Sequence, residues 1–326
     1  MSGMKGRVPG YQNFSGIDLG KFHGERVMDK LLRDKKAIIL FVAPALILFT
    51  LVLFIPIGTS FYYALCDYDK KTMTYNFIGF GNFVKLAKDP TMFIAFKNSM
   101  FFLVFSCVSQ LVFGLLFAAL LTNITKGRNL FKNVIYLPCV LSSAALGLLW
   151  AFLFHAKVGI NNILGAMGLP QPAWLYSTSG FITLPMWVIA FVALWQYVGQ
   201  SMMLYMAQIS GINKSLYEAS YIDGATKTQA FRYITLPLVK PMIGTAMSLN
   251  AIGSLKFFDL IYSMLGDKTE NLKMDVLATY LYRTGFSSKG GNHYGRASAI
   301  GVILVALCLI ATGIINKLFK SENYEM

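Results

Sequence analysis

Long uncharged apolar stretches constrain this chain more than any other feature of its sequence. Residues 37–66 contain no charged side chain, and a membrane-spanning helix needs only about 20 mostly apolar residues. Five further apolar stretches follow, at residues 98–122, 133–154, 181–208, 241–263 and 297–316. Of the six, only 241–263 contains charges, at Lys256 and Asp259. The sequence therefore predicts an all-α integral membrane protein with six transmembrane helices.

The composition agrees with a membrane protein. Only 13% of the 326 residues are charged, against about 25% in a typical soluble domain, and 56% are apolar. These values exclude a disordered chain and argue against a water-soluble enzyme. The four cysteines are far apart in the sequence, so they indicate neither a disulfide framework nor a metal site; they are Cys66, Cys107, Cys139 and Cys308.

The distribution of lysine and arginine predicts the orientation in the membrane. If both termini are cytoplasmic, the inner segments carry 17 basic residues, and outer segments of equal total length carry 11. An excess of positive charge marks the cytoplasmic side, so we expect both ends inside. The basic residues that give the net charge of +14 lie next to the apolar stretches. This placement favours anionic lipid over nucleic acid as their partner. The basic leader 1–36 lacks the features of a cleavable signal. It fits either a solvated segment that fixes topology or an interfacial helix.

A polar segment at 212–237 is too hydrophilic to cross the membrane, yet its pattern is ordered. Ser215–Glu218 and Thr226–Gln229 each fit a capping box, in which a hydroxyl and an acid or amide satisfy free backbone donors. Gly224 lies between them, where it can end a helix, and Pro237 is predicted to end the second short helix. The residues alone fit either a rigid elbow that receives force from a partner or an ordered connector.

The same segment carries a resemblance to a known family. Residues 218–225 have the sequence EASYIDGA, and Phe231 and Leu236-Pro237 follow. This pattern resembles the EAA loop of ABC importer permeases, in particular those that transport sugars. It departs from that pattern at Ser220, where alanine is usual. Three other segments also resemble the family, so that the likeness covers about residues 80–318; they are Arg128–Phe131 followed by Pro138, Phe257–Tyr262, and Tyr294–Ala299.

The resemblance implies a type I ABC importer permease fold. The transmembrane core would be 98–318, preceded by a first helix at 37–66 and an extracytoplasmic segment at 67–97, with a cytoplasmic tail at 319–326. The chain would lie in a bacterial-type cytoplasmic membrane and pair with a second permease subunit, an ATPase dimer and an external sugar-binding protein. The residues that the family pattern assigns to ATPase coupling are Glu218, Ala219, Ser220, Asp223, Gly224 and Ala225.

The resemblance also places ATP hydrolysis, with its Mg²⁺, on the ATPase partner, so that this chain would bind no cofactor and catalyse no reaction. The sequence agrees, because it contains no GxxxxGK[ST] phosphate loop, no HExxH zinc motif and no GxSxG nucleophile turn.

A sugar site needs hydroxyl or amide partners and aromatic surfaces. Two of the predicted spans offer such residues, which would face the helix bundle rather than lipid. The candidates for the substrate path are Trp195, Gln196, Tyr197, Gln200, Asn250 and Ser254. The alternative is that they only join neighbouring helices. Lys256 and Asp259 are three residues apart and opposite in charge, which predicts a structural or gating ion pair.

Other transporters remain possible on the sequence alone. One alternative is an ABC permease for a different solute, such as a glycerol phosphodiester. A neutral sugar fits better, because Lys256 is the only cation within the predicted spans. A second alternative, an ion-coupled secondary transporter, predicts acidic residues deep in the spans and inverted repeats. Apart from Asp259, neither feature is found.

Overall fold

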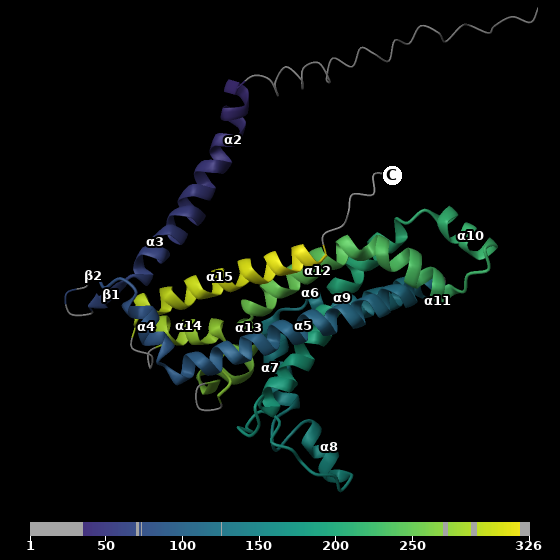
Figure 1. Ribbon diagram of the computed structural model, residues 1–326. Helices are drawn as coiled ribbons and strands as arrows, with labels where there is room; N and C mark the ends of the chain where they lie inside the picture. The colour runs from purple at the N-terminus through teal and green to yellow at the C-terminus, as the bar shows by residue number, and fades with distance from the viewer. Residues whose placement is uncertain are drawn as a thin grey trace, which may run out of the picture. The chain divides into compact units, whose positions relative to one another are not determined.

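The computed structural model describes residues 35–69, 72, 74–124, 126–269, 273–287 and 292–319 (Figure 1). The predicted leader and tail therefore lie almost wholly outside the described residues. The chain forms two units, divided between Thr59 and Ser60. The first contains α2 (Lys35–Phe49), a π-helical turn (Thr50–Phe54) and the start of α3 (Ile55–Ala64). Residues 38–64 meet the length and hydropathy of a membrane span, which agrees with the first predicted helix.

A short β-hairpin opens the second unit after α3. Strands β1 (Cys66–Asp69) and β2 (Thr74–Phe77) pair antiparallel, with Cys66 opposite Phe77. Helix α4 (Gly81–Ala87) holds the hairpin, because the buried Asn82 side chain donates hydrogen bonds to the carbonyls of Ala64 and Cys66, at 2.9 and 2.8 Å. The prediction of an all-α protein is thus wrong at this hairpin, although the rest of the described chain is mainly helical.

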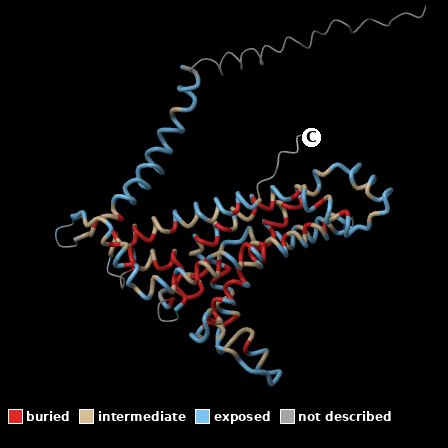
Figure 2. Tube along the Cα trace, in the orientation of Figure 1, coloured by how far each residue is buried: buried red, intermediate tan, exposed pale blue. Residues whose placement is uncertain are grey.

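Four long helices form the core of the second unit. They are α5 (Pro90–Asn123), α9 (Leu184–Ser210), α12 (Leu236–Leu255) and α15 (Tyr294–Leu318). α5 packs against both α9 and α12, and α12 also packs against α15. The buried residues lie along the surfaces where these helices meet, and the outward surfaces are exposed (Figure 2). Those exposed surfaces are rich in Leu, Val, Ile and Phe, which suits contact with lipid.

The third predicted span is broken. α6 (Arg128–Val140) and α7 (Ser143–Leu153) meet at an angle of 95°. Pro138 in the last turn of α6 cannot donate a backbone hydrogen bond, which weakens the helix there. The Ser143 hydroxyl, at the start of α7, lies 2.9 Å from the Tyr197 hydroxyl and accepts a hydrogen bond from the Gln196 amide of α9 at 2.9 Å. These contacts hold the bend.

The fifth predicted span, 241–263, is also interrupted. α12 ends at Leu255, three residues follow in other conformations, and α13 (Asp259–Leu265) begins a new helix. Among the described residues, four helices are long and apolar enough to cross a membrane, or five if the bent α6–α7 pair counts as one span. The predicted count of six transmembrane helices is therefore not confirmed.

The remaining elements are short. They are α8 (Ile160–Ala166), a 3₁₀ turn (Gly266–Thr269) and α14 (Leu277–Phe286). The segment before α14 is joined to α5 by Asn98, whose side-chain amide donates to the carbonyls of Lys273 and Asp275 at 3.1 and 2.9 Å. Within it, the buried Asp275 carboxylate forms an ion pair with Arg283 at 2.7 Å.

Candidate functional site

The 212–237 loop contains α10 (Lys214–Ile222) and α11 (Lys227–Ala230). Asn213 is the N-cap of α10, and its side-chain oxygen accepts a hydrogen bond from the backbone N–H of Ser215 at 3.0 Å. The predicted capping box at Ser215–Glu218 is therefore wrong, because the helix begins two residues earlier in the sequence than that box requires. Asn213 is an equally good cap, and its side chain leaves Glu218 free to face solvent.

Gly224 ends α10 as predicted. Its φ is +81°, a left-handed conformation that only glycine adopts without strain. The N–H of Gly224 donates to the carbonyl of Tyr221, and the N–H of Ala225 donates to the carbonyl of Ser220, at 3.1 and 2.9 Å. These two bonds form a Schellman motif, which fixes the direction in which the chain leaves the helix.

The second half of the loop continues into the core. The predicted Thr226–Gln229 capping box is confirmed, with the Gln229 side chain accepting from the Thr226 backbone at 2.7 Å. However, Pro237 does not end the helix. α11 passes through a π-helical turn (Phe231–Thr235) directly into α12, whose first turn contains Pro237. The wider π turn accommodates the missing N–H donor of proline.

The loop residues that the family pattern assigns to ATPase coupling are mainly exposed to solvent. Glu218, Ala219 and Asp223 are exposed, and no residue of α10 is buried. The exceptions are Ser220 and Ala225, which are half-buried; the Ser220 hydroxyl donates to the carbonyl of Tyr217 at 2.8 Å. α10 also exposes apolar surface, since Ile222 is 87% exposed.

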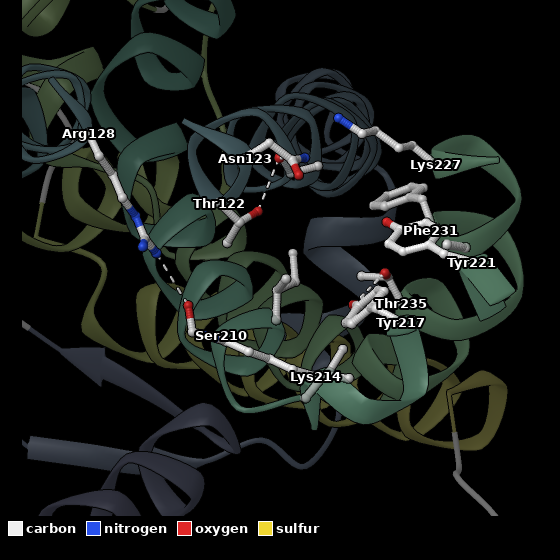
Figure 3. A pocket seen from close by; sticks show the side chains of 14 residues that line it. Thr122, Asn123, Arg128, Ser210, Lys214, Tyr217, Tyr221, Lys227, Phe231 and Thr235 are labelled. Atoms are coloured by element: carbon white, nitrogen blue, oxygen red, sulfur yellow. Dashed lines mark hydrogen bonds between the residues drawn. The ribbon is translucent and has the colours of Figure 1, made fainter. Parts of the chain in front are cut away.

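One contact ties α10 to the helix that enters the core. The hydroxyl of Tyr217 lies 2.8 Å from that of the buried Thr235, in the π turn (Figure 3). A displacement of α10 can therefore reach α12 through this contact as well as through the backbone.

A second candidate site is a cavity of about 260 Å³ between α5, α9 and α12. It contains aromatic rings, amides and hydroxyls, and none of its residues is charged; they are Phe102, Ser106, Gln110, Ala193, Tyr197, Gln200, Leu249, Asn250, Gly253, Ser254 and Phe257. Such a surface can bind an uncharged polar molecule that also has an apolar face.

Four of the six substrate-path candidates line this cavity: Tyr197, Gln200, Asn250 and Ser254. A hydrogen-bond network between helices positions one of them, Asn250. The Asn250 amide donates to the Ser201 hydroxyl at 3.1 Å, and Ser201 donates to the Gln110 side chain at 3.1 Å. The network joins α12, α9 and α5, so it fixes the Asn250 side chain at the cavity surface.

The other two candidates lie elsewhere. Trp195 is 37% exposed and packs edge-on against Trp150, with ring centroids 5.4 Å apart. Gln196 is buried and donates to Ser143 at the α6–α7 bend. Neither lines the cavity. Because residues 195, 196 and 197 point about 100° apart around a helix, only one of the three can face a given cavity directly.

Two aromatic residues and one serine of the cavity were not predicted: Phe102, Phe257 and Ser106. Phe102 and Phe257 stack with ring centroids 5.0 Å apart, and Phe257 also meets the Tyr197 ring edge-on. Phe102 and Ser106 are four residues apart, and their shared face with Gln110 was the available signal. Phe257 could not be found this way, since it lies in the break after α12.

The predicted ion pair between Lys256 and Asp259 is not formed. Both side chains are exposed, and the ion pairs found within the described part of the chain do not join them. The prediction assumed a continuous helix, in which residues three apart share a face. The helix instead ends at Leu255 and restarts at Asp259.

No group of three or more potential metal ligands occurs among the described residues.

Comparison with known proteins identifies the relatives of this chain. A family model described as a binding-protein-dependent transport system inner membrane component matches residues 110–321. A probable ABC transporter permease protein, YurN of Bacillus subtilis (strain 168), is 34% identical, and the match covers 88% of this chain and 97% of YurN. The lactose transport system permease protein LacF of Rhizobium radiobacter is 31% identical, with 83% and 90% covered.

A solved structure agrees in fold. It is the crystal structure of a bacterial alginate ABC transporter in complex with an alginate pentasaccharide-bound periplasmic protein. One of its chains aligns with a TM-score of 0.74 at 25% identity, covering 90% of this chain and 96% of that one.

Proposed function

Because the chain belongs to the family of binding-protein-dependent transport system inner membrane components, we propose that it is the permease subunit of an ATP-driven importer for a neutral di- or oligosaccharide. In this proposal it pairs with a second permease and with an ATPase dimer, which binds ATP and Mg²⁺. An extracytoplasmic binding protein delivers the sugar. The chain itself binds no cofactor, and both of its termini are cytoplasmic.

The observation that carries the choice of substrate is the uncharged cavity between α5, α9 and α12. The amides of Gln200 and Asn250 and the hydroxyl of Ser254 can exchange hydrogen bonds with sugar hydroxyls. The rings of Phe102 and Phe257 offer surface to the apolar face of a sugar. A phosphodiester would enter a cavity with no lining cation, and its desolvated charge would be unpaired. The cavity therefore supports a neutral solute.

The path from the loop to the cavity supports coupling. A continuous helical run extends from Lys227, through the π turn, to Leu255, and it contains Asn250 and Ser254. The exposed apolar surface of α10 suits a protein partner rather than water. In this proposal Glu218 is the charged contact with the ATPase, and Ala219 permits close approach. When ATP closes the ATPase dimer, α10 moves, and the helical run carries that movement to the cavity.

Purification of the tagged chain from membranes in mild detergent tests the assembly. We expect a second permease, an ATPase and a sugar-binding protein to copurify, with ATP hydrolysis stimulated by the loaded binding protein. The variant Glu218→Ala should lower the stimulated rate about tenfold or more. Thr228→Ala is the matched control, since Thr228 is exposed on the same loop and takes no part in the capping box. A chain that purifies alone and transports on an ion gradient without ATP would overturn the importer.

Uptake measurements test the cavity. A panel of disaccharides and oligosaccharides is compared with glycerol phosphodiesters in vesicles containing the complete importer. Asn250→Leu should reduce sugar uptake about tenfold, because a lost hydrogen bond and an unpaired sugar hydroxyl cost roughly 1–3 kcal/mol. Ser248→Ala is the control on α12, since Ser248 does not line the cavity. Preference for the phosphodiester would refute the neutral-sugar proposal.

A further inference from the structure

A separate pocket lies where the 212–237 loop, here called the coupling loop after its proposed role, meets the ends of the core helices (Figure 3). Its volume is about 420 Å³, which is within the range of small-molecule sites. α5, α6, α9 and the 212–237 loop all contribute residues to it. It is distinct from the membrane cavity, since the two have no lining residue in common.

The pocket is lined by three cations and no acid. The cations are Arg128, Lys214 and Lys227. Across the described residues, the ion pairs found include none of the three. The Arg128 guanidinium donates one hydrogen bond, to the Ser210 hydroxyl at 3.3 Å. The two acids of the loop, Glu218 and Asp223, do not line the pocket.

The backbone adds to this positive charge instead of balancing it. Arg128 and Lys214 are the first residues of α6 and α10, and neither helix has an acid in its first turn. A helix begins at its positive end, where a cation is unfavourable and an anion is favourable. The two helix ends and the three cations therefore all favour an anion in this pocket.

Neutral polar groups complete the lining. In Figure 3, Arg128 lies on one side of the pocket and Lys227 on the other, with Thr122 and Asn123 of α5 between them. The hydroxyl of Tyr217 also borders the pocket, next to Thr235. A guanidinium can bind two oxygens of one phosphate at once, and an ammonium adds a point charge.

We propose that this pocket binds a phosphate-bearing anion, which joins Arg128 of the core to Lys214 and Lys227 of the coupling loop. The phosphate can come from an anionic phospholipid of the adjacent leaflet or from a soluble phosphate ester. Bound there, it holds α10 and α11 against the ends of α5 and α6. The proposed transport of sugar assigns no role to this pocket, so the inference goes beyond that function and does not depend on the identity of the sugar.

The test uses the complete importer, purified in detergent and stripped of lipid. In one arm, glycerol phosphate is titrated by calorimetry. In the other, the importer is placed in bilayer discs of phosphatidylcholine with or without phosphatidylglycerol, and retained lipid is counted by native mass spectrometry. We expect saturable binding in at least one arm, and that arm identifies the source of the phosphate.

Variants assign the binding to the pocket. Arg128→Gln and Lys227→Gln should each weaken binding about tenfold or more. Lys132→Gln should leave it unchanged, because Lys132 lies one turn further along α6 and does not line the pocket. Equal loss in all three variants would indicate a diffuse charge effect and overturn the site.

Absence of binding in both arms would also overturn the site. Sugar uptake is measured on the same preparations, so the two proposals fail separately: a variant that binds no phosphate can still import sugar, and an importer that rejects sugars can still bind phosphate.

Discussion

At the scale of single residues, the turn between α10 and α11 depends on the backbone of Gly224. Its left-handed φ allows two backbone hydrogen bonds that end α10 and direct the chain into α11. No other atom lies within 4 Å of the place where a Cβ would stand. Glycine is therefore required at position 224 for its backbone conformation, and not because a larger side chain would clash.

Substitutions at Gly224 test that distinction. Asparagine visits the left-handed region more readily than other residues, whereas a β-branched residue is a strong outlier there. We expect Gly224→Asn to retain most of the stimulated ATP hydrolysis, and Gly224→Val to lose most of it, with a local cost of roughly 1–2 kcal/mol or more. If both variants behaved alike, a conformational role for Gly224 would be refuted.

Single residues also show what the sequence could and could not predict. Gly224 and the Thr226–Gln229 cap depend on neighbours close in sequence, and both were predicted. Trp195 and Gln196 do not line the cavity, because the face of a helix that meets a cavity depends on helices distant in sequence. Phe257 was missed because no periodic pattern extends through a helix break.

At the scale of elements, the close crossing of α6 and α9 depends on a glycine. A Cβ on Gly199 of α9 would stand 2.5 Å from the carbonyl oxygen of Ile135 and 2.7 Å from the Cα of Tyr136. Both are backbone atoms of α6, so a side-chain rotation cannot relieve the contact. The helices approach this closely because position 199 has no side chain.

Gly199→Val should separate the two helices and weaken the hydrogen bonds that Gln196 and Tyr197 make with Ser143. Overpacking of this kind costs roughly 1–3 kcal/mol. Thermal unfolding of the purified importer should show a lower Tm. Gly313→Ala on α15 is the control, since nothing lies within 4 Å of the place where its methyl group would stand and a helical Gly→Ala change is neutral or mildly stabilising. An unchanged Tm in Gly199→Val would contradict the close-packing role.

The N-terminal end of α5 provides a pH dependence. Asp89 caps the helix by accepting from the Thr91 N–H at 2.8 Å, and it also accepts from the Tyr280 hydroxyl of α14. Partial burial raises the pKa of the Asp89 carboxyl, but the hydrogen bonds from Tyr280 and Thr91 outweigh it, so that the pKa is lower than usual. A lowered folded-state pKa gives stability that is complete above the unfolded pKa, about 3.9, and is lost as the pH falls through the folded value.

We therefore expect the Tm of the importer to fall in acid below about pH 4 partly through Asp89. Asp89→Asn keeps the shape of the cap but removes the titration, so the difference in Tm between wild type and variant should shrink as the pH decreases. The neighbouring pair of Asp67 and Lys85, at 2.9 Å, remains in both proteins and cancels in that difference. A difference that stays constant with pH would rule out this role for Asp89.

The elements also show why the predicted count of six spans is not confirmed. Apolar stretches gave the positions of α5, α9 and α15 well, because each is a single long helix. Hydropathy does not reveal a bend. In the third and fifth stretches the helix breaks after Val140 and after Leu255, while the composition stays apolar. Local backbone chemistry and contacts with α9 decide the structure there.

At the scale of the whole molecule, the two candidate sites lie on one helical run. The coupling loop begins it at Lys227, and Asn250 and Ser254 bring it to the membrane cavity. In the proposed function, the 212–237 loop meets an ATPase in the cytoplasm. That proposal requires the loop to be cytoplasmic, and it predicts that the β-hairpin and α8 are extracytoplasmic.

Cysteine labelling in intact cells tests this orientation. In a chain whose native cysteines are replaced, single cysteines are introduced by Asn76→Cys in β2, Asn162→Cys in α8 and Thr228→Cys in α11, all exposed positions. A membrane-impermeant maleimide should label the cysteines at positions 76 and 162. The cysteine at position 228 should stay unlabelled until the cells are permeabilised. Because labelling depends on which side of the membrane a residue occupies, reaction of Thr228→Cys in intact cells would reverse the assigned topology. The loop could not then reach a cytoplasmic ATPase, and the coupling path from α10 to the cavity would have to be abandoned.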